Sequence, residues 1–279
     1  MTFKVDRIIL GDCSEVLRNF PDKCIDLIIT SPPYANNRCK TYRGVPVDRY
    51  VEWFLPIADE LKRVLKPRGS FILNIKERVV NGERHTYVLE LITELRKQGW
   101  RWTEEYIWHK KNCPPGKWSN RFRDAWERCL HFTKQENFKM YQENVKVPIG
   151  DWSKNRLRRL NGTDIVRHNS QTLSGFGRNV SNWLGRKYVY PTNVLHLPTE
   201  CSNRNHSAAF PISIPKWFIL LFTKKGDVVL DPFIGSGTTA LAAIELNRRY
   251  VGIEIAKKYQ KLALYSIRNH RKKIGGMKK

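Results

Sequence analysis

Two segments near opposite ends of the chain carry residue types that could do chemistry. In the first, Asp26-Leu-Ile-Ile-Thr-Ser-Pro-Pro-Tyr34, an apolar strand runs into two prolines. Proline fixes its own backbone angle and cannot donate to a sheet ladder, so Pro32 and Pro33 predict a rigid corner. Ser31 and the carbonyl groups around Pro32 would be fixed hydrogen-bond acceptors, and Tyr34 would provide a rigid aromatic ring for stacking. Such a corner suits a planar base with an exocyclic amino group. The plain alternatives are a Pro-Pro turn without function and a proline-rich docking ligand.

The second segment, Val228–Thr239, joins an apolar strand to a helix through a turn that contains Gly235 and Gly237. Glycine lets backbone N–H groups come close to a ligand in front of a helix N-terminus. The segment is not a Walker loop, because no lysine follows the glycines, and Ala240 replaces the third glycine of a G-x-G-x-x-G pattern. Glu254, at the end of the next strand, is placed to bind ribose hydroxyls. The layout predicts a nucleoside-bearing ligand, the alternative being a tight turn that binds nothing.

Alternating strands and helices must position these two segments. Apolar runs predict strands over Arg7–Leu10, Ile25–Thr30, Ser70–Ile75, Trp102–His109, Val228–Leu230 and Tyr250–Ile255. Helical spacing predicts helices over 14–20 (with Ser14 as N-cap), Tyr50–Leu65, Tyr87–Gln98, Trp217–Phe222 and Thr238–Leu246. Strict alternation of this kind implies crossover connections, so we expect an α/β fold with a mostly parallel sheet and helices on both faces.

Residues 135–205 interrupt this pattern with short segments rich in Asn, Ser, Gly, Arg and Lys. We therefore expect residues 1–134 and 206–279 to form the two halves of one α/β domain. Residues 135–205 would be an inserted, loop-rich recognition region between them. The insertion contains a basic cluster, and the chain ends in a basic tail, Arg271–Lys279, that we expect to be mobile. The cluster and the tail are candidate phosphate contacts, a solvated basic face being the alternative; the cluster comprises Lys154, Arg156, Arg158 and Arg159.

The charge balance favours nucleic acid as the partner. Lys and Arg number 50 against 26 Asp and Glu, a net charge of +24, and such a surface repels itself unless it meets a polyanion. An anionic membrane surface is the alternative, but the longest apolar run, Trp217–Phe222, is far too short to span a bilayer, and Met1–Leu10 does not resemble a signal peptide. The 6 cysteines form no C-x-x-C pair, which argues against zinc and fits reduced thiols in a cytoplasm.

Together, Thr30-Ser-Pro-Pro-Tyr34 and Asp231-Pro-Phe-Ile-Gly-Ser-Gly-Thr-Thr239 resemble the paired motifs of amino-group DNA methyltransferases that use S-adenosylmethionine. The catalytic motif precedes the cofactor motif, which is the permuted order of the β group of that family. Gly11-Asp12-Cys13 resembles the family's early acidic motif, and Trp102–Pro115 resembles the motif with an aromatic residue near the target base. Asn205–Pro211 resembles the segment that closes over the methionine end of the cofactor, with Ser207 where relatives often have proline.

The resemblance covers nearly the whole chain outside 135–205, and it implies a Rossmann-like methyltransferase fold. Residues 1–134 would form its catalytic half and 206–279 its cofactor-binding half. The implied catalytic residues are Ser31, Pro32, Pro33 and Tyr34, with Trp108 stacking on the target base. The implied cofactor contacts are Asp12, Thr30, Ser207, Phe210, Asp231, Phe233, Gly235, Ser236, Gly237, Thr238 and Glu254, with the methionine end assigned to Asp231 and the ribose to Glu254. No metal is implied.

The finer prediction is transfer of a methyl group to N4 of a flipped cytosine in double-stranded DNA. In this family serine usually precedes Pro-Pro-Tyr in N4-cytosine enzymes, and Asp or Asn in N6-adenine enzymes, so Ser31 favours cytosine. No covalent intermediate is needed, so we predict no nucleophilic cysteine. The alternatives are an N6-adenine enzyme, a methyltransferase acting on RNA or protein, and a catalytically silent DNA-binding protein.

The implied setting is a bacterial or archaeal restriction-modification system. The protein would then be cytoplasmic, associated with the nucleoid through DNA, and paired with a cognate restriction endonuclease. It would be a monomer or a homodimer.

Overall fold

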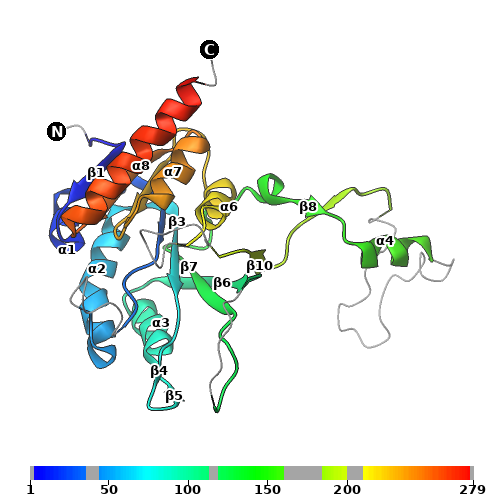
Figure 1. The fold of residues 1–279 in the computed structure, drawn as a ribbon, viewed down its shortest axis with the longest axis horizontal. Coiled ribbons are helices and arrows are strands. Elements are labelled where there is room, and N and C mark those ends of the chain that lie inside the picture. Colours follow the sequence, from blue (N-terminus) through cyan, green and yellow to red (C-terminus); the bar gives the residue numbers. More distant parts are fainter. Residues whose placement is uncertain (1–2, 36–43, 113–118, 160–183, 200–209, 277–279) are drawn as a thin grey trace. The chain divides into compact units, whose positions relative to one another are not determined.

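A computed structural model describes residues 3–35, 44–112, 119–159, 184–199 and 210–276 (Figure 1). The chain divides into a larger unit, residues 1–141 with 193–279, and a smaller unit, residues 142–192. The smaller unit is narrower than the predicted insertion, 135–205, because its flanks join the larger unit: Lys139 N–H donates to the Arg68 carbonyl at 3.0 Å, and Val194–Leu197 pairs with the main sheet. In the described part of the chain, no helix is both long and apolar enough to cross a membrane.

The described residues of the larger unit form an eight-stranded sheet that contains both motifs. Its strands, in spatial order, are β1 (Arg7–Leu10), β12 (Arg249–Glu254), β11 (Val228–Asp231), β2 (Ile25–Thr30), β3 (Leu65–Ile75), β7 (Trp126–Thr133), β6 (Arg101–Lys110) and β10 (Val194–Leu197). Strand β7 runs antiparallel to both of its neighbours, and the other pairings in this sheet are parallel. The predicted mostly parallel sheet is therefore confirmed.

Helices cover both faces of the sheet (Figure 1). One layer comprises α1 (Cys13–Val16), the 3-10 turns η1 (Leu17–Asn19) and η2 (Val47–Arg49), α2 (Tyr50–Val64) and α3 (Tyr87–Lys97); the other comprises α6 (Ser213–Phe222), α7 (Thr238–Glu245) and α8 (Lys257–Gly276). The main buried cluster joins Phe54 of α2 and Leu91 of α3 to Ile28 and Leu230 of the sheet. Side chains alternate along a strand, so neighbouring residues such as Val229 face the opposite helix layer.

Shorter elements complete the described structure. The larger unit also contains the hairpin β4 (Val79–Val80) and β5 (Glu83–Arg84), and the smaller unit contains η3 (Gln142–Val145), β8 (Val147–Pro148), α4 (Asp151–Arg158) and β9 (Tyr188–Val189).

Helix α1 begins differently from the prediction. The N-cap is Asp12, not Ser14: the Asp12 carboxylate accepts hydrogen bonds from the Ser14 backbone N–H at 2.8 Å and from the Ser14 hydroxyl at 2.7 Å. A carboxylate only accepts, and it also favours the positive end of the helix dipole, so it outcompetes the hydroxyl two residues later.

The residue patterns did not predict β7 or α8. Strand β7 contains Glu127, Arg128 and His131 among its apolar residues, so its sequence shows no strand pattern. The partners of these polar side chains lie elsewhere in the chain. Helix α8 buries only a narrow stripe, and its other positions are mostly charged. The expected mobile tail from residue 271 is instead helical as far as Gly276. Since α8 starts where β12 ends and runs back along the sheet, this basic end lies far from the carboxyl ends of the parallel strands (Figure 1).

A buried carboxylate anchors the centre of the sheet. Asp26 of β2 is 1% exposed and accepts hydrogen bonds from Lys66 Nζ at 2.6 Å, Lys139 Nζ at 2.9 Å and the Val228 N–H at 3.1 Å. Burial opposes ionisation, but the hydrogen bonds from the two lysines outweigh it and hold the pKa of Asp26 below its ordinary value. The carboxylate thus joins β2 to β11 and to the segment that follows β7.

Asp26→Ala should lower the free energy of unfolding by about 2–4 kcal/mol, because it leaves a buried N–H and two ammonium groups without their acceptor. Urea unfolding followed by circular dichroism measures the change. The matched control is Asp22→Ala, whose exposed carboxylate pairs with Arg63 at 2.6 Å and should contribute less than about 1 kcal/mol. Equal losses in the two variants would contradict the anchoring role.

Candidate active site

The two motifs meet where the strand order reverses. Strands β11 and β2 are neighbours, but β11 leads through α7 to β12 on one side, whereas β2 leads through α2 to β3 on the other. The chain therefore turns away in opposite directions from this point, and α/β proteins bind ligands in the crevice at the carboxyl ends of the two strands. Thr30 and Asp231 are the last residues of β2 and β11, so both motifs open onto this crevice.

A buried hydrogen-bond cluster joins the two motifs directly. The carboxylate of Asp231 accepts from the Thr30 hydroxyl at 2.6 Å, from the Thr239 hydroxyl at 2.6 Å and from the Phe233 N–H at 3.1 Å. Burial raises the pKa of Asp231 to about 6, although the bonds from Thr239 and Thr30 favour the ionised form. Thr30 and Asp231 are predicted cofactor contacts; in this structure their side chains bind one another and join the two motifs.

The glycine turn is held by a second carboxylate. Gly235 and Gly237 have φ values of 54° and 93°, which favour glycine, and Gly237 caps α7. A Cβ atom on Gly237 would lie 3.1 Å from the Cβ of Ala263 in α8, so this position is also sterically tight. Glu254, at the end of β12, accepts from the N–H groups of Gly235 and Ala256, both at 2.9 Å. Its carboxylate therefore shapes the turn in this structure.

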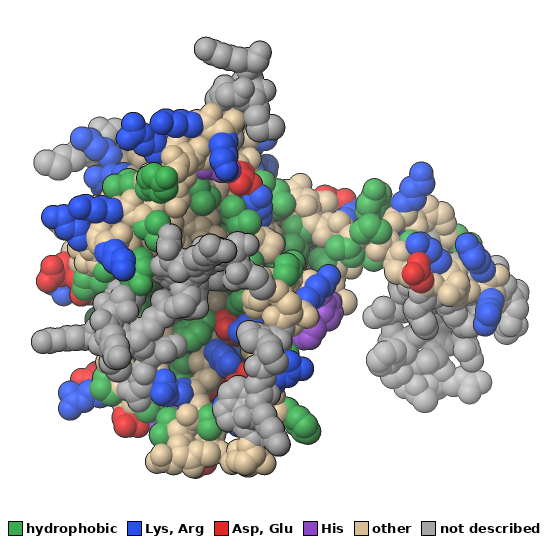
Figure 2. Space-filling model, viewed as in Figure 1, with side chains coloured by type: hydrophobic (Ala, Val, Ile, Leu, Met, Phe, Trp, Pro, Cys, Tyr) green, Lys and Arg blue, Asp and Glu red, His purple; other side chains and the backbone are tan. Residues whose placement is uncertain are grey.

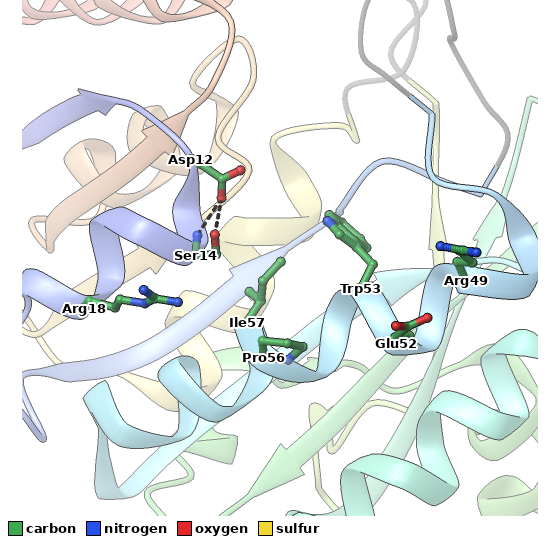
Figure 3. Close-up of a pocket in the computed structure, with 8 residues that line it drawn as sticks. All are labelled: Asp12, Ser14, Arg18, Arg49, Glu52, Trp53, Pro56 and Ile57. Carbon is green, nitrogen blue, oxygen red and sulfur yellow. Dashed lines mark hydrogen bonds between the residues drawn. The ribbon is translucent and has the colours of Figure 1, made fainter.

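A cavity lies beside this turn. It has a volume of about 420 Å³, within the range of small-molecule sites. Asp12 and Ser14 line it from the end of β1, and α2 lines it from the other side (Figure 3). The full lining is Asp12, Ser14, Arg18, Arg49, Glu52, Trp53, Pro56 and Ile57. The Trp53 ring also packs against Phe233 of the second motif, with centroids 5.8 Å apart, so the cavity adjoins the glycine turn.

Three residues of the cavity wall, Arg49, Glu52 and Trp53, are not among the site residues predicted from the sequence. Trp53 was read only as part of the apolar stripe of a helix, and helical spacing cannot tell a core position from a cavity wall. The available signal is an arginine, a glutamate and a tryptophan within five residues, at the start of the helix that follows the Pro-Pro-Tyr corner.

The Pro-Pro-Tyr corner follows β2 directly. The Tyr34 hydroxyl donates to Glu127 Oε2 at 2.5 Å and lies 3.5 Å from the Ser31 hydroxyl. Trp108 of β6 stands in register with Glu127 of β7, so their side chains share one face of the sheet. Its ring is 4% exposed, its Nε1–H donates to the Leu197 carbonyl at 3.0 Å, and Lys110 Nζ lies 5.1 Å from its centroid. Any base contact by Trp108 is thus limited to its uncovered edge.

The remaining predicted residues fall into three groups. Pro32 and Phe210 are buried and Pro33 is half-buried, whereas Ser236 and Thr238 are half-buried in the glycine turn. Ser207 lies outside the described residues. In the smaller unit, Lys154, Arg158 and Arg159 are exposed in or next to α4; Arg156 belongs to α4, but its side chain lies outside the described ones.

Comparisons with known proteins agree with this geometry. A family model described as DNA methylase, for N6 and N4 methyltransferases, matches residues 25–265. The Type II methyltransferase M.PvuII of Proteus hauseri is 30% identical over 281 residues, which cover 90% of this chain and 80% of that protein. The solved PvuII DNA methyltransferase, described as cytosine-N4-specific, superposes with a TM-score of 0.69 at 25% identity, covering 95% of this chain and 86% of that one. A putative DNA modification methylase of Thermus thermophilus, solved with S-adenosyl-L-methionine, gives a TM-score of 0.62 at 24% identity, covering 95% and 94%.

The architecture is thus the Rossmann-like fold of S-adenosylmethionine-dependent methyltransferases, as predicted. The chain belongs to the DNA methylase family of N6 and N4 amino-methyltransferases. The family inferred from the two motifs is confirmed.

Asp231→Asn should change how stability depends on pH. Because the pKa of Asp231 is raised from 3.8 to about 6, the folded protein holds this proton more tightly than the unfolded chain does, and the group's contribution to stability falls as pH rises between these values. The wild type should therefore lose stability relative to the variant as pH rises. We expect the difference in free energy of unfolding, variant minus wild type, to increase by about 1–3 kcal/mol from about pH 4 to pH 7. Urea unfolding of both proteins across this range measures the difference, and a difference independent of pH would contradict the raised pKa.

Proposed function

We propose that this protein transfers a methyl group from S-adenosylmethionine to the N4 amino group of a cytosine in double-stranded DNA. The observation that carries the proposal is the 2.6 Å bond between Thr30 and Asp231, because it brings the Pro-Pro-Tyr corner and the glycine turn together at one crevice. A base held at the corner and a cofactor held at the turn are then neighbours. Membership of the DNA methylase family supports DNA as the substrate.

The residues around the cavity fit S-adenosylmethionine. The cavity offers carboxylate acceptors from Asp12 and Glu52, a guanidinium from Arg49 and the aromatic ring of Trp53. These groups match the hydroxyl, amino, carboxylate and adenine groups of the cofactor. The glycine turn adds backbone close to the same space. When bound, the cofactor supplies a methyl group on an electrophilic sulfonium.

The chain's own residues would hold and orient the base. A base within a duplex is out of reach, so the target cytosine is flipped out at a cost of a few kcal/mol. The Ser31 hydroxyl and the carbonyl groups around Pro32 then accept hydrogen bonds from the amino group, which turns its lone pair toward the crevice. Tyr34 stacks on the ring, with the edge of Trp108 beside it. Catalysis here is positioning, since the reacting groups need no covalent activation by the protein.

Ser31 supports cytosine over adenine. The cytosine-N4-specific PvuII DNA methyltransferase resembles this chain over most of its length. A hydroxyl both accepts and donates, which suits an amino group beside a ring nitrogen. Transfer to N6 of adenine is the other outcome that the experiment below distinguishes.

Ser31→Ala should lower kcat by about 100-fold or more, because the amino group loses the acceptor that orients it. Incubation of duplex DNA with tritiated cofactor measures turnover, and mass spectrometry of the digested nucleosides identifies the methylated base. Fluorescence quenching should show unchanged cofactor affinity. Full turnover by the variant would contradict the role of Ser31. Detection of N6-methyladenine in DNA treated with the wild type would show that adenine, not cytosine, is the target base.

The smaller unit is the proposed DNA-contact region outside the catalytic crevice. Lys154, Arg158 and Arg159 are exposed along or next to α4, and Figure 2 shows the basic side chains gathered on this helix. Lys154 also pairs with Asp151 at 3.0 Å, so the two arginines are the better phosphate ligands. Together with Arg156 they are proposed to contact the DNA backbone.

Arg158→Ala combined with Arg159→Ala should flatten the salt dependence of DNA binding. Each lost phosphate contact reduces the slope of log affinity against log salt by about 0.9, so we expect a reduction of about 1.8. Fluorescence anisotropy with labelled duplex DNA at several KCl concentrations gives the slope. The control is the pair Lys224→Ala and Lys225→Ala, which removes equal charge from the turn before β11. This turn lies at the amino ends of the strands, whereas Ser31 lies at their carboxyl ends. If both pairs of substitutions reduce the salt-dependence slope equally, the effect comes from the net charge of the protein and not from phosphate contacts at Arg158 and Arg159.

A further inference from the structure

A buried carboxylate outside both motifs contacts the Pro-Pro-Tyr corner. Glu127 of β7 is 6% exposed, and each of its carboxylate oxygens has a partner. Oε2 accepts the hydrogen bond from the Tyr34 hydroxyl at 2.5 Å, and Oε1 accepts from Lys110 Nζ at 2.6 Å. The side chain of Lys110 is itself largely buried, so this ion pair is shielded from water and screened little by salt.

The bond to Glu127 determines which way the Tyr34 hydroxyl points. A phenol has one proton to donate, and the short, charge-assisted bond to Glu127 takes it in preference to Asn74 Oδ1, which lies 3.4 Å away. Burial, and next the negative charge of Glu127, raise the pKa of Tyr34 well above its ordinary value, so the hydroxyl keeps this proton. The phenol oxygen therefore presents its lone pairs to its other neighbour.

That neighbour is the Ser31 hydroxyl, which donates toward Tyr34 Oη over a long contact of 3.5 Å. A serine hydroxyl has one proton and two lone pairs. When its proton points at Tyr34, both lone pairs are left to accept from a third group. Since Ser31 is proposed to accept a hydrogen bond from the target amino group, a hydroxyl rotor fixed in this direction suits that task.

The ion pair between Lys110 and Glu127 also lies beside Trp108, the second aromatic residue of the site. Lys110 Nζ lies 5.1 Å from the centroid of Trp108, which stands opposite Glu127 in the β6–β7 register. One buried pair thus contacts both Tyr34, in the loop after β2, and Trp108 of β6, without itself lying at the corner.

We propose that Glu127, held by Lys110, is a positioning residue for methyl transfer: it orients the Tyr34 hydroxyl and, through it, makes Ser31 an acceptor for the amino group of the target base. This inference rests on the proposed function. It assigns a role to a residue that neither motif contains, and it makes Glu127 act through Tyr34 rather than on the base.

Glu127→Gln should lower kcat about tenfold while leaving cofactor affinity unchanged, because it removes the charge from a buried hydrogen bond at constant size. The matched control is Glu105→Gln, which removes the charge from a carboxylate of β6 that pairs with Arg128 in the same hairpin. Tritium transfer to duplex DNA gives kcat and KM, and thermal unfolding followed by circular dichroism reports on the fold. The Glu105 variant should retain wild-type kcat.

A double-mutant cycle distinguishes positioning from a merely structural role. If Glu127 acts through the Tyr34 hydroxyl, adding Glu127→Gln to Tyr34→Phe should cause no further loss of kcat. Losses that multiply would overturn the proposal, as would a Glu127→Gln protein with wild-type kcat. Glu127→Asp, which keeps the charge but withdraws the carboxylate, is compared in the same cycle if the glutamine variant does not fold. If the wild-type protein methylates no DNA, the proposed function itself is wrong. That result is distinct from the outcomes that contradict only the role of Glu127.

Discussion

The bond between Thr30 and Asp231 is the constraint on which the site depends. These residues lie far apart in the chain but end two adjacent parallel strands, and their side chains meet at 2.6 Å in a fully buried position. Because the same carboxylate also binds Thr239, the start of α7 is fixed relative to the end of β2. The shared carboxylate thus ties the corner to the glycine turn.

Acidic residues at this edge of the sheet divide into two kinds by burial. Asp231 and Glu254 are buried and accept hydrogen bonds from the chain itself. Asp12 and Glu52 line a cavity, and one oxygen of Asp12 also caps α1. A buried carboxylate is stable only with such internal donors, so it shapes the site, while a carboxylate at a cavity wall is available to a ligand. Residue type alone does not separate these two roles.

The antiparallel strand β7 brings polar groups beneath the catalytic corner. It lies between β3 and β6, so Glu127 can meet Lys110 from one neighbour and Tyr34 from the loop after β2. Elsewhere on the strand, Arg128 pairs with Glu77, and His131 contacts Ser70. Glu127, Arg128 and His131 each have at least one partner from another element, which is what allows a strand with these residues inside a sheet.

Local patterns in the residues were enough to predict the α/β class, β1 and β2 at their observed bounds, and the two motifs, because apolar runs, prolines and glycines act within a few residues of themselves. They misplaced the cap of α1 and missed β7, α8 and Trp53. The roles of Asp231, Glu254 and Glu127 depend on partners from distant parts of the chain, and no spacing within one segment encodes those partners. Only the tertiary structure decides which carboxylates are buried against their own chain and which remain for a ligand, because burial is a property of the packed strands and helices together.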